Sequence, residues 1–315
     1  MVSAALLTAI SVGCLLGAVC LRRASWPIRG PHVAVVVWQA LGLAWGIATI
    51  GALLAFAVAP YGLGVVGGIS ALYAEARSGG VSLARLDASP FGAAELGALL
   101  AALALTALLC SALAVSLFQV LRTRRRHREL LRLVARDDPE VPGARVLDHP
   151  GTAAYCLPGI TGAQVVISTG AVAVLQRREL SAVLAHEHAH LRQRHDLVLL
   201  PFSSLKRAFP KVPFVESCYS AVALLIEICA DDHARRTHCA RELATALLRF
   251  GSSGKGTVPP GALAAQADSS EPEVVTRVSR LLDPTLELSR TATAGALLFA
   301  TTLMTTTMAL WKIPF

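Results

Sequence analysis

Four long runs of apolar residues contain no charged side chain, and each is long enough to cross a bilayer as a helix. They cover residues 1–21, 33–58, 96–121 and 291–311. A spanning helix needs about 20 predominantly apolar residues. The last run is rich in threonine, whose hydroxyl can bond back to a carbonyl of its own helix. The pattern therefore predicts about four transmembrane helices.

The charges between these runs predict how the chain is threaded. Residues 22–32 hold three arginines and no acid, and residues 122–136 hold seven arginines and one glutamate. Positive charge next to spanning helices is typical of the cytoplasmic side. We therefore expect a multi-pass protein of the cell membrane with its N-terminus outside. The Gly- and Ser-rich stretch 59–91, with balanced charge, is expected to be an outer loop.

Nucleic-acid binding is an alternative interpretation of the basic run 122–136. Its position directly after a spanning helix favours contact with anionic lipid head groups instead. We expect the bilayer as a partner and no direct contact with nucleic acid. The chain then divides into a membrane domain (1–121), a cytosolic domain (122–290) and a fourth spanning helix with a short external end (291–315).

The cytosolic stretch has the pattern of a mixed α and β domain. Short apolar segments at 145–147, 153–157 and 164–168, separated by Pro-Gly turns, predict three strands. Such a sheet could offer an edge to an extended peptide, or it could serve only as core. Residues 251–271, rich in Gly, Ser, Pro and Ala, are expected to be a loop, as a lid or a linker. Residues 272–282 are expected to be helical.

A His-Glu-x-x-His sequence occurs at His186-Glu187-x-x-His190. It lies within an apolar stripe of helical period formed by Leu180, Val183, Leu184, Glu187 and Leu191. Positions i and i+4 share a helix face, so both imidazoles can bind one metal ion. Glu187 can then take a proton from a water at that metal. The alternative is an amphipathic helix that carries solvated histidines.

A second helical run, beginning at residue 219, ends in an acidic cluster. Glu227 lies deep in apolar sequence, where a carboxylate is costly without a partner. Glu227 could be the third zinc ligand, and Asp231, four residues later, could accept a hydrogen bond from a ligand histidine. The alternative is a helix-end cluster paired with Arg235 and Arg236. We favour the metal site, with one Zn²⁺ per chain.

The oxyanion of peptide hydrolysis needs a further donor. Candidates are Tyr155, His233, His238 and Arg277, and the sequence does not rank them. His195, five residues past His190, is off the ligand face. It is expected at the surface or behind a ligand, not on the metal.

Composition supports a membrane protein in a reducing compartment. The 315 residues are 54% hydrophobic and only 16% charged, with a net charge of +8. The seven cysteines are odd in number and show no Cys-x-x-Cys spacing. The spanning runs carry no ionisable residue of the kind that marks a transport path, which makes a transporter a weak interpretation.

The chain resembles the BlaR/MecR-type integral membrane metalloproteases, which share a gluzincin core with the HtpX and CAAX-processing families. The resemblance rests on the segments 154–159 (AYCLPG), 168–170 (STG) and 179–187 (ELSAVLAHE), together with the helix order. It implies that His186, His190 and Glu227 bind zinc, that Glu187 is the general base and that Asp231 supports a ligand. It also implies a short form without the external β-lactam-binding domain.

The expected fold is an α-helical membrane protein with a mixed α+β cytosolic metalloprotease domain of the gluzincin type. The expected activity is cleavage of a cytoplasmic protein, such as a BlaI-like transcriptional repressor in a signalling pathway, and an oligomer is possible. One alternative is an HtpX-like quality-control protease. The other is a non-catalytic receptor whose structural zinc takes a fourth ligand from Cys229 or His233.

Overall fold

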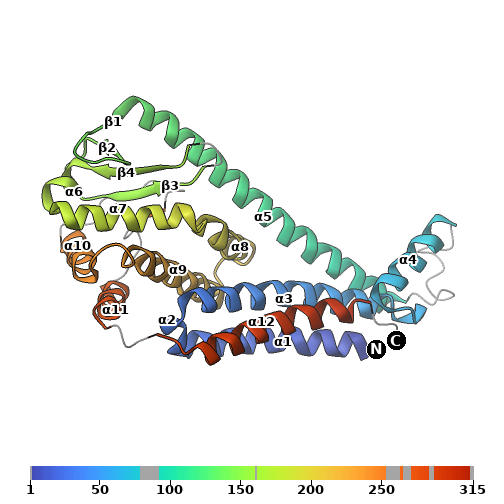
Figure 1. The fold of residues 1–315 in the computed structure, drawn as a ribbon. Helices are drawn as coiled ribbons and strands as arrows, with labels where there is room; N and C mark the ends of the chain where they lie inside the picture. The colour runs from blue at the N-terminus through green and yellow to red at the C-terminus, as the bar shows by residue number, and fades with distance from the viewer. Residues whose placement is uncertain are drawn as a thin grey trace. The chain divides into compact units, whose positions relative to one another are not determined.

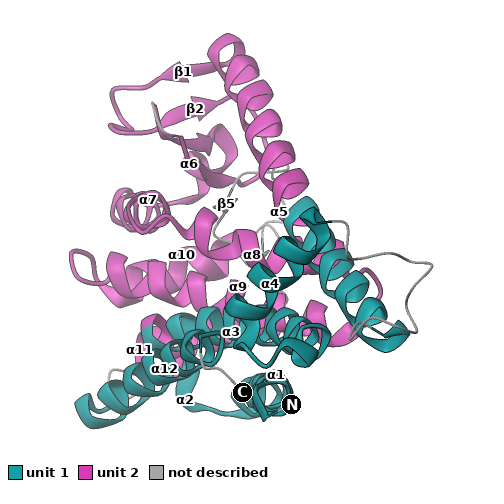
Figure 2. Ribbon diagram, turned by 90° about the vertical axis from the view of Figure 1, so that its right-hand side faces the viewer, with its two compact units in different colours: residues 1–27, 33–111, 289–315 teal, residues 28–32, 112–288 magenta. Residues whose placement is uncertain are grey.

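A computed structural model describes residues 2–78, 92–159, 162–252, 263–264, 271–283 and 287–312. The chain forms two compact units, which Figure 2 shows in different colours. The first unit comprises residues 1–27, 33–111 and 289–315. The second comprises residues 28–32 and 112–288. Along the sequence, one division between the units falls within the short helix α2 (Trp26–Arg29).

The first unit is a bundle of apolar helices. It contains α1 (Val2–Arg23), α3 (Pro31–Ala57), α12 (Arg290–Leu310) and the beginning of α5 (Ala93–Val134). Figure 1 shows α1, α3 and α12 side by side, and Leu7, Ala48 and Leu310 are buried together among them. A hydrogen bond of 2.7 Å joins the hydroxyls of Ser11 and Thr49 between α1 and α3. Leu16, Leu103 and Phe299 are exposed on the helices, as expected where lipid takes the place of water.

Part of the stretch expected to be an outer loop is helical. Residues Ala59–Tyr61 form a 3₁₀ turn and Gly64–Arg77 form α4. Glycine lowers helix propensity, but here it permits close packing. A β carbon on Gly68 would lie 2.5 Å from the Val58 side chain. The loop prediction is therefore wrong for residues 64–77, and residues 79–91 lie outside the described part.

Among the described residues, five helices are long and apolar enough to cross a membrane. They are α1, α3, α5, α9 (Pro213–Ala234) and α12. Four of them cover the predicted apolar runs. The fifth, α9, meets the same criterion of length and composition and packs within the second unit against α7 and α8. The protein is thus mostly helical, with several helices suited to a bilayer.

The second unit contains a five-stranded mixed sheet. Its strands are β1 (Ala135–Asp137), β2 (Arg145–Leu147), β3 (Ala154–Leu157), β4 (Gln164–Ser168) and β5 (Leu263–Ala264), in the order β1-β2-β4-β3-β5. Strands β2 and β4 are parallel, and all other neighbours are antiparallel. The three predicted strands are confirmed. β1 was not predicted, and β5 occurs within the expected loop 251–271, where residues 253–262 and 265–270 are not described.

Helices cover both faces of this sheet (Figure 1). α7 (Arg177–Arg192) packs on one face, where Leu180 and Val183 meet Cys156 and Ile167. The end of α5 packs on the other face through Leu131. The remaining helices of the unit are α6 (Thr169–Val174), α8 (His195–Ala208), α10 (Ala240–Ser252) and α11 (Glu271–Leu282). α9 packs against α7, α8 and α11, so α7 lies between the sheet and α9.

Candidate metal centre

The His-Glu-x-x-His sequence lies on α7, which begins with a capping box. The Gln176 backbone N–H donates to the Glu179 carboxylate at 2.9 Å. In return, the Gln176 side chain accepts from the backbone N–H of Glu179. These contacts satisfy donors that the first turn leaves free. The apolar side of α7 is held on the sheet. His186, Glu187 and His190 are fully buried.

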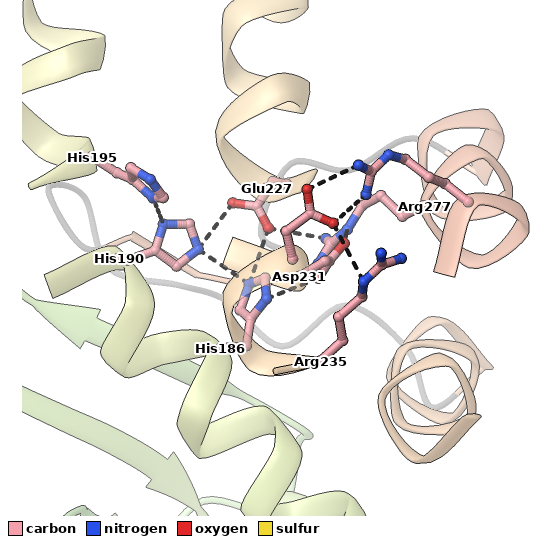
Figure 3. Close-up of polar contacts among 9 residues, drawn as sticks. His186, His190, His195, Glu227, Asp231, Arg235 and Arg277 are labelled. Carbon is pink, nitrogen blue, oxygen red and sulfur yellow. Dashed lines mark hydrogen bonds and ion pairs between the residues drawn. The ribbon is translucent and has the colours of Figure 1, made fainter. Parts of the chain in front are cut away.

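Three potential ligand atoms converge between α7 and α9. The Nε2 atoms of His186 and His190 are 3.1 Å apart. Oε2 of Glu227 lies 3.4 Å from Nε2 of His186, and Oε1 of Glu227 lies 3.4 Å from Nε2 of His190 (Figure 3). Two ligands at about 2.0–2.1 Å from a tetrahedral zinc ion are separated by about 3.3 Å. The observed separations and the two-imidazole, one-carboxylate donor set therefore fit a zinc ion.

Asp231 lies one helical turn past Glu227 and is also buried. Its Oδ1 is 2.9 Å from Nδ1 of His186. With Nδ1 occupied on this side, Nε2 of His186 is the nitrogen left for a metal. A carboxylate in this position fixes the ring orientation and tautomer of a ligand histidine.

Arg277 of α11 pairs with both acidic residues of α9. Its Nε and Nη2 lie 2.8 Å and 2.7 Å from the two oxygens of Asp231, and its Nη1 lies 2.9 Å from Oε2 of Glu227. The Arg277 side chain is fully buried. Although burial opposes its charge, these carboxylates raise the pKa of Arg277. Each of its nitrogens thus faces a carboxylate, and Arg277 joins α11 to the cluster.

The histidines of the cluster differ in proton affinity in the metal-free protein. Burial alone would lower the pKa of His186, but Asp231 and Glu227 outweigh it and raise this pKa to about 9. Burial lowers the pKa of His190 to about 3, although Glu227 opposes this effect. Burial likewise lowers the pKa of His195 to about 3, and His186 adds to the shift. His190 and His195 are therefore neutral at physiological pH.

Glu187 follows His186 on α7 and is likewise buried. The Cys156 thiol of β3 donates a hydrogen bond to its carboxylate, and burial together with the charge of Glu187 raises the pKa of this thiol. Glu187 thus lies between the sheet and the histidine pair. The thiol contact was not anticipated, because nothing in the spacing of the two residues indicates it.

The other candidate residues are not brought to the cluster. Tyr155 points to the opposite face of the sheet from Cys156, where its hydroxyl lies 2.8 Å from Nε2 of His127 on α5. Burial raises the pKa of Tyr155 to about 12. His233 is not part of the group of metal-ligand atoms. His238 contacts the Ser181 hydroxyl at 2.8 Å, on the exposed side of α7.

Comparison with known proteins agrees with this site. Residues 120–225 match the sequence profile of Peptidase family M48. The match covers about a third of the chain, including the His-Glu-x-x-His sequence, and ends before Glu227. No curated protein and no solved structure matches the chain. Enzymes of this family are metal-dependent peptidases, typically with zinc. Residues 120–225 are therefore similar to the metallopeptidase domain of Peptidase family M48, and the described part of the chain also has helices long and apolar enough to cross a membrane.

Proposed function

We propose that this protein is a membrane-embedded zinc endopeptidase that cleaves a cytoplasmic protein. The observation that carries the proposal is the convergence of Nε2 of His186, Nε2 of His190 and the Glu227 carboxylate, with Glu187 next to His186. These three residues would hold the metal. When bound, zinc would polarise the scissile carbonyl and make a water molecule more acidic.

Glu187 would act as the general base. Its carboxylate accepts a proton from the attacking water as the water oxygen bonds to the carbonyl carbon. It then gives that proton to the amine nitrogen as the C–N bond breaks, so it ends in its starting state. Burial keeps bulk water from competing for the carboxylate. Asp231 and Arg277 would hold His186 and Glu227 in place rather than touch the substrate.

The number of ligands supports a catalytic site over a structural one. Structural zinc sites are closed by four protein ligands, whereas catalytic sites keep one position open. Within the described ranges, the cluster contains only His186, His190 and Glu227. Cys229 and His233, which a structural site would require, do not belong to it. A receptor with a structural zinc is therefore less well supported.

For the substrate, we propose a BlaI-like transcriptional repressor. The basis is the resemblance of segments 154–159, 168–170 and 179–187 to the BlaR/MecR-type proteases. For the topology, we propose an outer N-terminus and a cytoplasmic protease domain, because seven arginines follow the apolar part of α5. A protease on that side of the membrane would have access to a soluble repressor.

The test is a substrate trap in native membranes. Glu187→Gln should keep zinc but lose the base, so a bound substrate should persist long enough to be cross-linked. His186→Ala, which removes a ligand from the same helix, is the matched control that should neither bind zinc nor retain substrate. Activity of Glu187→Gln on the trapped protein should fall by about 10²–10⁴-fold.

The outcomes separate the alternatives. A small DNA-binding repressor enriched with Glu187→Gln but not with His186→Ala would support the signalling role. Enrichment of a broad set of misfolded membrane proteins would instead support the role of a quality-control protease. If the wild-type chain contains no zinc and Glu187→Gln retains no protein, the protease proposal is wrong.

A further inference from the structure

The two histidines of the metal cluster are supported from behind by different chemical groups. Nδ1 of His186 faces the carboxylate of Asp231 at 2.9 Å. Nδ1 of His190 faces Nδ1 of His195, also at 2.9 Å (Figure 3). Ligand histidines usually donate this second N–H to a carboxylate, a carbonyl or water. An imidazole in that position is a departure that requires its own explanation.

We propose that His195 is a positioning residue that fixes the tautomer and the ring orientation of His190. This inference rests on the proposed metal site. For Nε2 of His190 to offer a lone pair beside Glu227, its proton must be on Nδ1. His195 must then accept that proton with an unprotonated Nδ1, and its own proton must be on Nε2.

The remaining contacts fit this single arrangement of protons. Nε2 of His195 lies 3.2 Å from Oε1 of Gln193, which can only accept. Nε2 of His32 lies 3.2 Å from the same oxygen and can donate to its second lone pair. The line His190–His195–Gln193–His32 therefore has one donor and one acceptor at every contact. It runs from the buried cluster to an exposed residue of the same unit.

Burial makes the His195 contact costly to lose. His190 is fully buried and His195 is 4% exposed. The rings of the two residues meet edge to face, with centroids 4.9 Å apart. Without an acceptor, the buried Nδ1–H of His190 would be left unsatisfied, so that the ring would be free to turn or to change tautomer.

Charge balance explains why the supporting group is neutral. In and next to the metal cluster, the carboxylates of Glu187, Glu227 and Asp231 already lie around the guanidinium of Arg277. A divalent metal ion and Arg277 together balance these three negative charges. A further carboxylate behind His190 would leave an uncompensated negative charge in a buried site, which is unfavourable. A neutral imidazole accepts the proton without adding charge.

The local backbone places His195 where it is needed. α7 ends at Arg192, and Arg194 adopts a left-handed conformation with φ of 51°. α8 then begins at His195. The next residue, Asp196, is anchored by Arg124 of α5 at 2.9 Å. The turn and this anchor hold the first residue of α8 against the ring of His190.

The experiment measures zinc affinity of the full-length protein in detergent by competition with a chelator. His195→Leu removes the acceptor and should weaken zinc binding by about 10–100-fold. His195→Asn places an amide oxygen near the position of Nδ1 and should recover most of that loss. His195→Gln extends its amide toward the position of Nε2 and should recover little. The control is His188→Leu, at an exposed histidine of the same helix whose Nδ1 lies 2.7 Å from the Leu184 carbonyl oxygen.

The results distinguish this inference from the proposed function. If the wild-type protein binds no zinc, the metal site itself fails. If the wild-type protein binds zinc and His195→Leu binds it equally well, only the role of His195 is refuted. If His195→Leu does not fold, the comparison of zinc affinity between His195→Asn and His195→Gln decides. Zinc binding by His195→Asn no tighter than by His195→Gln would also refute it.

Discussion

Arg277 offers a sharp test of how the cluster is held together. Its guanidinium contacts Asp231 through two nitrogens and Glu227 through the third, at 2.7–2.9 Å. Arg277→Met keeps an unbranched apolar stem but removes the guanidinium and its charge. Two carboxylates, of which Asp231 is almost completely buried, then lose the guanidinium that pairs with both of them.

The expected loss follows from this burial. Removing one partner of a buried ion pair costs about 3–5 kcal/mol, because a buried charge remains uncompensated. For a unit of this size, 1 kcal/mol corresponds to roughly 2–4 °C in melting temperature, so the expected drop is roughly 6–20 °C. The exposed ion pair between Arg178 and Glu242, at 3.8 Å, is the control. Arg178→Leu should cost about 0–1 kcal/mol.

The assay is thermal unfolding in detergent, with and without zinc. The drop for Arg277→Met should be smaller when zinc is present, since the ion compensates the charge of Glu227. The double variant Arg277→Met/Asp231→Asn should be more stable than Arg277→Met, because one of the stranded charges is gone. A metal-free melting temperature for Arg277→Met no lower than that of Arg178→Leu would refute the reasoning.

Two other predictions concern protons and packing. Because Asp231 and Glu227 raise the metal-free pKa of His186 to about 9, its ring is protonated at pH 7 and zinc must displace that proton. Zinc affinity should therefore rise about tenfold per pH unit up to near pH 9, with about one proton released per ion. Calorimetry in two buffers of different ionisation enthalpy measures this release, and binding without it would contradict the assignment. Gly170→Ala would place a β carbon 2.1 Å from the Pro150 carbonyl oxygen, so it should cost about 1–3 kcal/mol in thermal unfolding. Gly97→Ala, with open space around it, should not destabilise, and equal effects of the two would argue against the packing explanation.

Much of the secondary structure can be predicted from local sequence. The uncharged runs are so long and apolar that their composition alone predicts the helices α1, α3, α5 and α12. Short apolar segments separated by Pro-Gly turns predict the strands β2, β3 and β4. The sequence does not predict helix α4, because its glycines lower helix propensity, and only the tertiary structure shows that Gly68 lies against Val58. The strand β5 was missed for a similar reason. Two residues have little preference of their own and form a strand through pairing with β3.

The composition of the cluster could also be read from the sequence. His186 and His190 are four residues apart, as are Glu227 and Asp231, and this spacing alone puts each pair on one helix face. A glutamate within an apolar helix further indicates that it has a buried partner. Local periodicity was therefore sufficient to select these residues, and the packing of α7 on α9 then brought the two pairs within 2.9–3.4 Å.

What surrounds the cluster was decided by the tertiary structure. On a continuous helix, His195 would lie about 140° away from His190, and only the left-handed turn at Arg194 returns it to the ring. Arg277 lies 46 residues beyond Asp231, and no spacing rule connects α11 to α9. Tyr155 was a reasonable donor from its position in the sequence, but strand alternation turns it away from α7. Periodicity specifies which residues of one element share a face, whereas the partner of each face depends on contacts between segments that are distant in sequence.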